Sequence, residues 1–194
     1  MKQHPPQIAL LGTSADPPTY GHQALLEGLL KLFPTVVTWA SNNPIKCHSA
    51  SLENRQRLLQ GLVKAIAHPK LHLVQELSSP WTITTLERAQ SRWPNSKLTF
   101  VVGSDLVSQI PKWVRAKDVL EKARLGIAPR GGWPLKQNQI KVLESLGGSI
   151  DLLPLKIPAT ASSKIRSKAR LGQIPNCILP IVLKENLYGL TSNP

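Results

Sequence analysis

Apolar positions along the chain follow two alternating patterns. Short runs of adjacent apolar or β-branched residues predict buried strands, and apolar residues spaced three and four apart predict helices that cover them. The first pair is the run Ile8-Ala9-Leu10-Leu11 and a segment with Leu25, Leu26, Leu29 and Leu30. The expected strands cover residues 8–11, 35–40, 71–75, 98–102, 125–129 and 150–153. The expected helices cover residues 23–33, 52–67, 82–93, 116–123, 137–146, 162–171 and 181–186.

This alternation of strand and helix predicts an α/β fold. We expect a Rossmann-like, doubly wound parallel sheet with helices on both faces and a short C-terminal helical segment. The length of 194 residues suits one domain over residues 1–194, with its C-terminal helical part at about 158–194. Ligands of such sheets bind beyond the carboxyl ends of the strands. Four segments that follow strands are therefore expected to converge on one cleft: 12–22, 42–48, 103–105 and 129–130.

Composition narrows the class of protein. Hydrophobic residues make up 41% and charged residues 18%, which is typical of a globular chain and not of a disordered one. No segment approaches the roughly 18 uninterrupted apolar residues of a membrane helix, and the N-terminus lacks the apolar region of a signal peptide. Cys47 and Cys177 form no metal-binding or CxxC pattern, so we expect free thiols in a reducing compartment. A cytoplasmic protein without a membrane partner is expected.

The net charge of +13 and the isoelectric point of about 10.2 indicate a polyanionic partner. The basic residues are nevertheless scattered, and the densest run places Lys164, Arg166, Lys168 and Arg170 at every second position. That spacing spreads the charges around a helix instead of along one face. The pattern favours a solvated basic surface that attracts small polyanions, and it makes nucleic acid the less favoured partner.

Residues 12–22, Gly-Thr-Ser-Ala-Asp-Pro-Pro-Thr-Tyr-Gly-His, lie between the first expected strand and helix. The start of a helix offers unpaired backbone N–H groups and the positive end of its dipole, and small residues let a phosphate approach the backbone. His22 adds a side-chain donor at the same place. The segment therefore predicts a phosphate site that contains a histidine. The alternative is a plain turn in which His22 only caps the helix.

The combination of Asp16-Pro17 with Tyr20-Gly21-His22 resembles the phosphate-binding signature of the nucleotidylyltransferase superfamily, Gly-Gly-Thr-Phe-Asp-Pro-x-His-x-Gly-His. Later segments are similar to one branch of it, the nicotinate-nucleotide adenylyltransferases. Residues 79–86 resemble the branch's Ser/Tyr-Thr-Ile-x-Thr-Leu, and residues 102–105 with 110–113 resemble Gly-Ser-Asp followed by Leu-Pro-x-Trp. Residues 160–166 resemble Ile-Ser-Ser-Thr-x-Ile-Arg. The four segments occur in the family's order and span nearly the whole chain.

The resemblance implies a reaction of NAD biosynthesis. ATP and nicotinic acid mononucleotide would give nicotinic acid adenine dinucleotide and pyrophosphate. The phosphate of the mononucleotide would attack the α-phosphorus of ATP directly, so the protein would position two polyanions and stabilise charge without an enzyme nucleophile. Mg²⁺ would accompany ATP, held mainly by phosphates and water, and no metal ligand from the protein is expected.

Site residues follow from the same resemblance. The implied catalytic residues are His22, which would donate to the α-phosphate in the transition state, Thr19 and Arg166, which would hold the β- or γ-phosphate. The residues implied for ATP and phosphate binding are Gly12, Thr13, Ser14, Ala15, Gly21, Lys46, Gly103, Asp105, Ser162 and Ser163.

Specific roles are implied for part of this set. Residues 13–15 would supply backbone N–H groups, Ser162 and Ser163 would cap a helix, and Asp105 would accept hydrogen bonds from ribose hydroxyls. The mononucleotide is expected at two places. Backbone N–H groups around Thr85, at a helix start, would hold its carboxylate, and Trp113 would stack on its pyridine ring. Without the resemblance, the sequence slightly favours a core position for Trp113, beside Pro111.

The chain departs from the family signatures at several positions. Thr19 stands where the signature has its first His, Thr13 replaces the second Gly, Ala15 replaces Phe and Ala161 replaces the first Ser of the C-terminal segment. Threonine can donate a hydrogen bond to phosphate but cannot carry positive charge. The pantetheine-phosphate adenylyltransferase branch also has Thr at this place, so the change does not imply loss of activity.

Two alternatives remain open at this point. One is a related adenylyltransferase that uses nicotinamide mononucleotide or phosphopantetheine, and the other is a catalytically idle, basic nucleotide- or RNA-binding protein. A serine hydrolase is excluded because the chain has no Gly-x-Ser-x-Gly elbow. A metal hydrolase is excluded because its five histidines lack ligand spacing. A homo-oligomer is also open.

Overall fold

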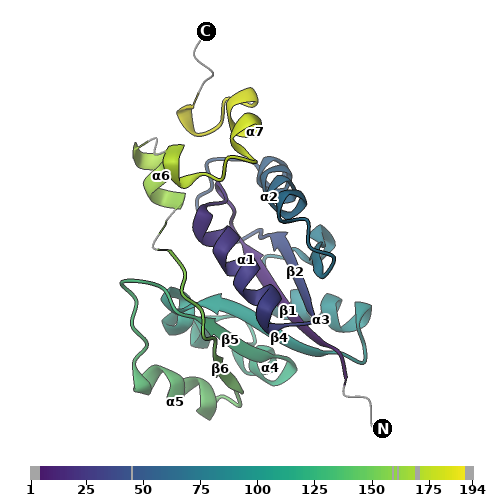
Figure 1. Cartoon of the computed structure of the whole chain (residues 1–194). Coiled ribbons are helices and arrows are strands. Elements are labelled where there is room, and N and C mark those ends of the chain that lie inside the picture. The colour runs from purple at the N-terminus through teal and green to yellow at the C-terminus, as the bar shows by residue number, and fades with distance from the viewer. Residues whose placement is uncertain (1–4, 45, 159, 161, 169–170, 191–194) are drawn as a thin grey trace.

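The computed structural model describes residues 5–44, 46–158, 160, 162–168 and 171–190. Its centre is a six-stranded parallel sheet in the order β3-β2-β1-β4-β5-β6 (Figure 1). The strands are β1 (Gln7–Thr13), β2 (Thr35–Ala40), β3 (Leu71–Leu73), β4 (Lys97–Gly103), β5 (Arg124–Ala128) and β6 (Ile150–Leu152). All six expected strands are confirmed, and the order changes direction between β1 and β4, which makes the sheet doubly wound.

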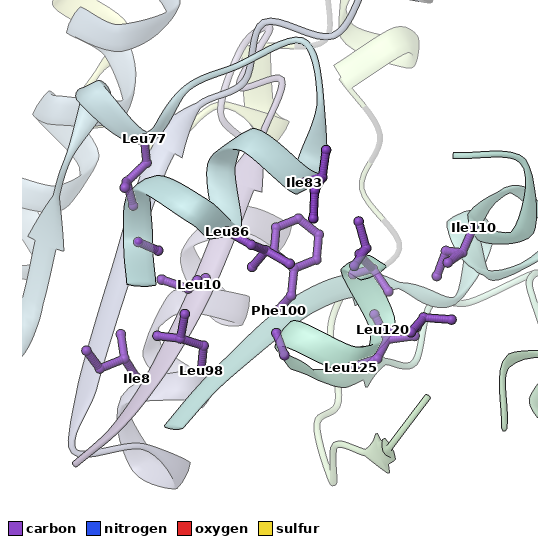
Figure 2. Close-up of a cluster of buried hydrophobic side chains, with 14 of the residues drawn as sticks. Ile8, Leu10, Leu77, Ile83, Leu86, Leu98, Phe100, Ile110, Leu120 and Leu125 are labelled. Atoms are coloured by element: carbon purple, nitrogen blue, oxygen red, sulfur yellow. The ribbon is translucent and has the colours of Figure 1, made fainter. Parts of the chain in front are cut away.

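The sheet is buried on both faces, and alternate residues of each strand enter different cores. Ile8 and Leu10 of β1 belong to one cluster, whereas Ala9 and Leu11 belong to the other. Figure 2 shows the first cluster, in which Leu10 lies among side chains of β4, β5 and the helices on that face. Burial on both faces explains why the strands appear in the sequence as continuous apolar runs.

Helices cover each face. α1 (Tyr20–Leu32), α2 (Leu52–Ile66), α6 (Ser162–Lys168) and α7 (Leu179–Lys184) contribute to one core, and α3 (Thr82–Arg92), α4 (Ala116–Lys122) and α5 (Gln137–Ser145) contribute to the other. All seven expected helices are present, within a few residues of the expected limits. In the described residues none of them has the length and apolar character needed to cross a bilayer. The short 3-10 helices are η1 (Gln75–Leu77), η2 (Ser104–Lys112), η3 (Leu171–Gln173) and η4 (Leu187–Gly189).

The helix η2 was not predicted. Its buried residues Ser104, Val107 and Ile110 recur every third position. A 3-10 helix has three residues per turn, so this spacing places all three side chains on one face, whereas an α-helix would spread them. Pro111 near its end further disfavours an α-helix. The period of three was present in the sequence.

After β6 the chain runs back alongside α1 to α6 (Figure 1). Leu155 of this return segment contacts Gly28 of α1, and Ile165 of α6 is fully buried in the same core as α1. The C-terminal part thereby reaches the N-terminal end of α1, more than a hundred residues away in sequence. The exact domain limits of 1–194 and 158–194 stay a prediction.

Candidate active site

Charged side chains from several loops meet beyond the carboxyl ends of the strands. His22, at the start of α1, lies in the electrostatic field of Arg130 and Lys46. Lys46 in turn interacts with Asp105, Arg130 and Arg166. We call Lys46, Arg130 and Arg166 the cationic cluster. The four segments expected to converge therefore do so, and the C-terminal helix α6 joins them.

His22 is the third residue of α1, and Thr19 is its N-cap. The backbone N–H of Thr19 donates to His22 Nδ1 at 3.0 Å, and Thr19 Oγ1 lies 2.8 Å from the same nitrogen. An Nδ1 that accepts from a backbone N–H carries no proton, so the neutral ring is protonated at Nε2. His22 thus caps the helix and still presents an N–H donor. The two interpretations of this residue, cap and phosphate donor, are compatible.

The local environment keeps the His22 ring neutral. Burial lowers the pKa of His22 to about 4, and the positive charges of Arg130 and Lys46 act in the same direction. The pKa of Lys46 is also lowered. Loss of solvation lowers the pKa of its ammonium group, Asp105 opposes this change, and Arg130 and Arg166 add to it. A site with this excess of positive charge is suited to a polyanion.

Asp105 is fixed by an ion pair. Arg130 Nη1 donates to Asp105 Oδ2 at 2.6 Å, and the Ser104 hydroxyl accepts from the Arg130 backbone N–H at 3.0 Å. Gly103 is required beneath this pair because a Cβ there would collide with Asp105 Oδ1. The ion pair holds the turn after β4 against the turn after β5. One oxygen of Asp105, Oδ2, is therefore engaged in the ion pair.

The loop of residues 14–19, which we call the phosphate loop, is held from two sides. Asp16, 1% exposed, accepts from the backbone N–H groups of Ser49 (2.8 Å) and Ala50 (3.1 Å). Arg166 Nη1 donates to the Asp16 backbone oxygen at 2.7 Å and lies 3.7 Å from its Oδ2. The Ser162 hydroxyl donates to the Pro17 carbonyl at 2.8 Å. Ser162 thus ties α6 to the phosphate loop, a contact the sequence did not predict. Ser163 is exposed on the first turn of α6.

A buried arginine supports the same loop from below. Arg55 of α2 is 2% exposed, and its guanidinium donates to the carbonyls of Ser14 and Ser41 at 2.8 Å and of Ala50 at 3.2 Å. Burial lowers the pKa of this arginine, and Asp16 opposes the change. Ser14 therefore has its carbonyl directed to Arg55, which orients the adjoining peptide of the loop.

Two predicted donors are corrected by the structure. The Ala15 N–H donates to Thr13 Oγ1 at 3.3 Å, and Ala15 is fully buried with a left-handed φ of +48°. It shapes the loop and is not an open phosphate donor. The Thr85 N–H donates to the Trp81 carbonyl at 3.2 Å, since α3 begins at Thr82 and Thr85 is already in its second turn. The open donors of this helix belong to residues 82–84.

The remaining predicted residues lie at the strand ends and near η2. Gly12 and Thr13 end β1, where Gly12 lies against the ring of Trp39. Gly21 is buried in the first turn of α1. Trp113 directly follows η2 and is partly buried, with its ring at 89° to that of Phe100 and the centroids 6.1 Å apart. Trp113 therefore belongs in part to the core, as one interpretation of the sequence allowed.

Sequence reasoning missed two groups in this site. Arg130 was only noted as following a strand, although a basic residue after a strand opposite Gly-Ser-Asp was a usable signal. Thr160 was noted only within its motif. Its hydroxyl accepts from the Gly21 N–H at 3.0 Å and lies 2.9 Å from Thr19 Oγ1. No local pattern indicates that contact.

Comparison with known proteins identifies the family of this chain. The cytidylyltransferase-like family model matches residues 10–168. The probable nicotinate-nucleotide adenylyltransferase of Synechocystis is 34% identical, over 94% of this chain and 98% of that protein. Its counterpart from Rhodopirellula baltica is 30% identical, over 93% and 92%. A Plasmodium falciparum nicotinic acid mononucleotide adenylyltransferase, solved with nicotinic acid adenine dinucleotide (NaAD), has the same fold, with a TM-score of 0.79 at 19% identity over 96% and 98%. The chain belongs to the nicotinate-nucleotide adenylyltransferases, a family of nucleotidyltransferase enzymes with a cytidylyltransferase-like domain.

Proposed function

We propose that this enzyme joins ATP and nicotinic acid mononucleotide to give nicotinic acid adenine dinucleotide and pyrophosphate. The observation that carries the proposal is the neutral His22, with Nδ1 capped by Thr19 and Nε2–H available, inside a cluster of positive charge. Such a donor can bind a phosphate oxygen without first gaining a proton. The reaction belongs in the cytoplasm, in keeping with the free thiols of Cys47 and Cys177.

The chemistry needs no nucleophile from the protein. A phosphate oxygen of the mononucleotide attacks the α-phosphorus of ATP, the bond to the β-phosphate oxygen breaks, and pyrophosphate leaves. His22 Nε2–H donates to the α-phosphate as negative charge accumulates there. Because the donor is fixed before the reaction, little reorganisation is needed at that moment. The charge of the phosphates itself raises the pKa of the imidazole, which strengthens the bond.

The cationic cluster holds the departing pyrophosphate. A guanidinium has five N–H donors, so Arg166 can keep its bond to the Asp16 carbonyl and still offer others to the β- or γ-phosphate. Lys46 adds a mobile charge from the loop after β2. ATP enters as its Mg²⁺ complex, with the ion held by phosphate oxygens and water.

The mononucleotide binds beside η2 and the start of α3. Backbone N–H groups of residues 82–84 are open at the positive end of the α3 dipole, where a carboxylate is stabilised. Trp113, which directly follows η2, supplies an aromatic surface. Asp105 Oδ1 accepts from a ribose hydroxyl while Oδ2 stays paired with Arg130.

Pyrophosphate release measured with ATP and each of three acceptors tests the proposal. We expect turnover with nicotinic acid mononucleotide to exceed turnover with nicotinamide mononucleotide and phosphopantetheine. A preference for nicotinamide mononucleotide would mean that the N–H groups at the start of α3 do not select the acid. Turnover with phosphopantetheine alone would overturn the proposal. No release with any acceptor, together with nucleic-acid binding that weakens steeply with salt, would favour an idle binding protein.

A further inference from the structure

We propose that Thr160 is a positioning residue, whose hydroxyl acts through Thr19 to hold the His22 ring in the orientation that presents Nε2–H to the phosphates. The inference rests on the proposed function only for the identity of the substrate. The hydrogen-bond arrangement itself is a property of the free enzyme. It joins the C-terminal segment to the start of α1 across 141 residues of sequence.

The direction of each hydrogen bond follows from one fixed donor. The Thr19 backbone N–H can only donate, so His22 Nδ1 accepts and carries no proton. Thr19 Oγ1, 2.8 Å from the same nitrogen, must therefore donate to it as well. Its single proton is then used, so Thr160 Oγ1 donates to Thr19 Oγ1 across 2.9 Å. Thr160 Oγ1 accepts in turn from the Gly21 N–H at 3.0 Å.

The packing around this chain of bonds leaves it little freedom. Thr19 is fully buried, and Gly21 is buried directly beneath Thr160. A Cβ at residue 21 would collide with Thr160 Oγ1 and come within 3.2 Å of the Pro158 carbonyl. Glycine at 21 is therefore what lets the C-terminal segment approach α1 closely enough to bond. In such a partly buried chain of hydrogen bonds, the loss of one hydroxyl weakens the bonds that remain.

The sequence is unusual at both ends of the central bond. The family signatures quoted above have His where this chain has Thr19 and Ile where it has Thr160. An isoleucine could not donate to Thr19, and a threonine without that donor would be free to turn its hydroxyl away from His22. The two threonines thus form a matched pair. Within this pair the Thr19 hydroxyl orients His22, although threonine lacks the charge of a histidine.

Two substitutions separate the hydroxyl from the shape of the side chain. Thr160→Val removes the hydroxyl at nearly constant volume, and Thr160→Ser keeps it. We expect Thr160→Val to lower kcat about 10-fold with a smaller change in the KM for ATP, and Thr160→Ser to stay within about twofold of wild type. Equal activity of the Val and wild-type enzymes would overturn the proposal. So would a Ser variant as impaired as the Val variant.

Nitrogen-15 NMR of the imidazole rings gives a readout that a merely structural role would not change. The signals of His22 are assigned by their loss in His22→Gln. We expect both rings to be protonated at Nε2, because the Thr19 backbone N–H donates to Nδ1 in both proteins. The Nδ1 signal should shift in the Val variant, because the second bond to this nitrogen, from the Thr19 hydroxyl, is no longer held in place. The groups that face the ring, Arg130 and Lys46, are the same in both proteins. An unchanged Nδ1 signal in Thr160→Val would assign any loss of activity to packing and reject the positioning role.

The wild-type spectrum keeps the test decisive if Thr160→Val does not fold. An Nδ1–H proton in wild-type His22 would overturn the bond directions at once. A double-mutant cycle with Thr19→Val adds a measure of coupling: after Thr19→Val, removing the Thr160 hydroxyl should cost less than about twofold in kcat. If the effects of Thr160→Val and Thr19→Val on kcat are fully additive, the two hydroxyls do not act together and the proposal is wrong. Absence of wild-type turnover with the mononucleotide would reject the proposed substrate, yet the NMR result would still decide the hydrogen bonding.

Discussion

In the phosphate half of the site, residues 14–22 are held by the side chains of Thr160, Ser162 and Arg166. In the acceptor half, around α3 and η2, the polar contacts span much shorter stretches of sequence, such as the 25 residues between Asp105 and Arg130. Arg166 reaches Asp16 across 150 residues, whereas Thr85 Oγ1 donates to the Leu77 carbonyl only 8 residues away. The first half depends on the chemical identity of long-range side chains, and the second on the local backbone and an aromatic surface. Substitutions in the phosphate half should therefore change kcat most, and those in the acceptor half should change the KM for the mononucleotide.

The largest effect is expected at His22. His22→Ala removes the donor to the α-phosphate and should lower kcat by about 10²–10³-fold, with a much smaller change in the KM for ATP. Steady-state pyrophosphate release measures both constants. His72→Ala, an exposed change on β3, is the matched control and should leave kcat within about twofold. Unchanged turnover of His22→Ala would show that the phosphate half works without its histidine.

The next effect concerns stability and pH. His22 has a pKa of about 4 in the folded protein, below the ordinary value of 6.5. Between these values the unfolded chain binds more protons than the folded one, so the free energy of unfolding falls as the pH drops from 6.5 to 4. The contribution is fully present above pH 6.5 and amounts to at most about 3 kcal/mol. Urea unfolding across this range should show wild type losing its stability advantage over His22→Gln. If the difference in free energy of unfolding between wild type and His22→Gln stays constant across this pH range, the His22 ring is in contact with water.

Arg166→Ala should raise the KM for ATP and lower kcat, together by about 10- to 100-fold in kcat/KM, because one charge-assisted donor is lost. Arg166→Lys keeps the charge but not the fork of donors, so it should recover only part of the loss. Arg57→Ala makes the same change of charge on the exposed face of α2 and serves as control. An equal loss in both alanine variants would mean that overall charge, not the site, binds ATP.

The contrast between local and long-range contacts also explains which features of the molecule could be predicted from the sequence. The strands and helices could be predicted because each buries its own apolar face, and that periodicity is local. The position of His22 at a helix start was visible for the same reason. The bond between Thr160 and Thr19 was not, since hydroxyl pairing leaves no periodic trace. Of the N–H groups predicted around Thr85, that of Thr85 itself is used within the helix, because the start of α3 at Thr82 decides which N–H groups remain open.

The smallest effect is expected in the acceptor half. Trp113→Phe keeps an aromatic ring against Phe100 but reduces the surface on which a pyridine ring can stack. We expect the KM for nicotinic acid mononucleotide to rise about three- to tenfold, with kcat and the KM for ATP within about twofold. Trp93→Phe is the control, because Trp93 packs partly buried against the same core at the far end of α3. If both variants weaken binding equally, Trp113 acts through the core. If only Trp113→Phe does so, with kcat preserved, the acceptor half recognises the mononucleotide by surface while the phosphate half carries the chemistry.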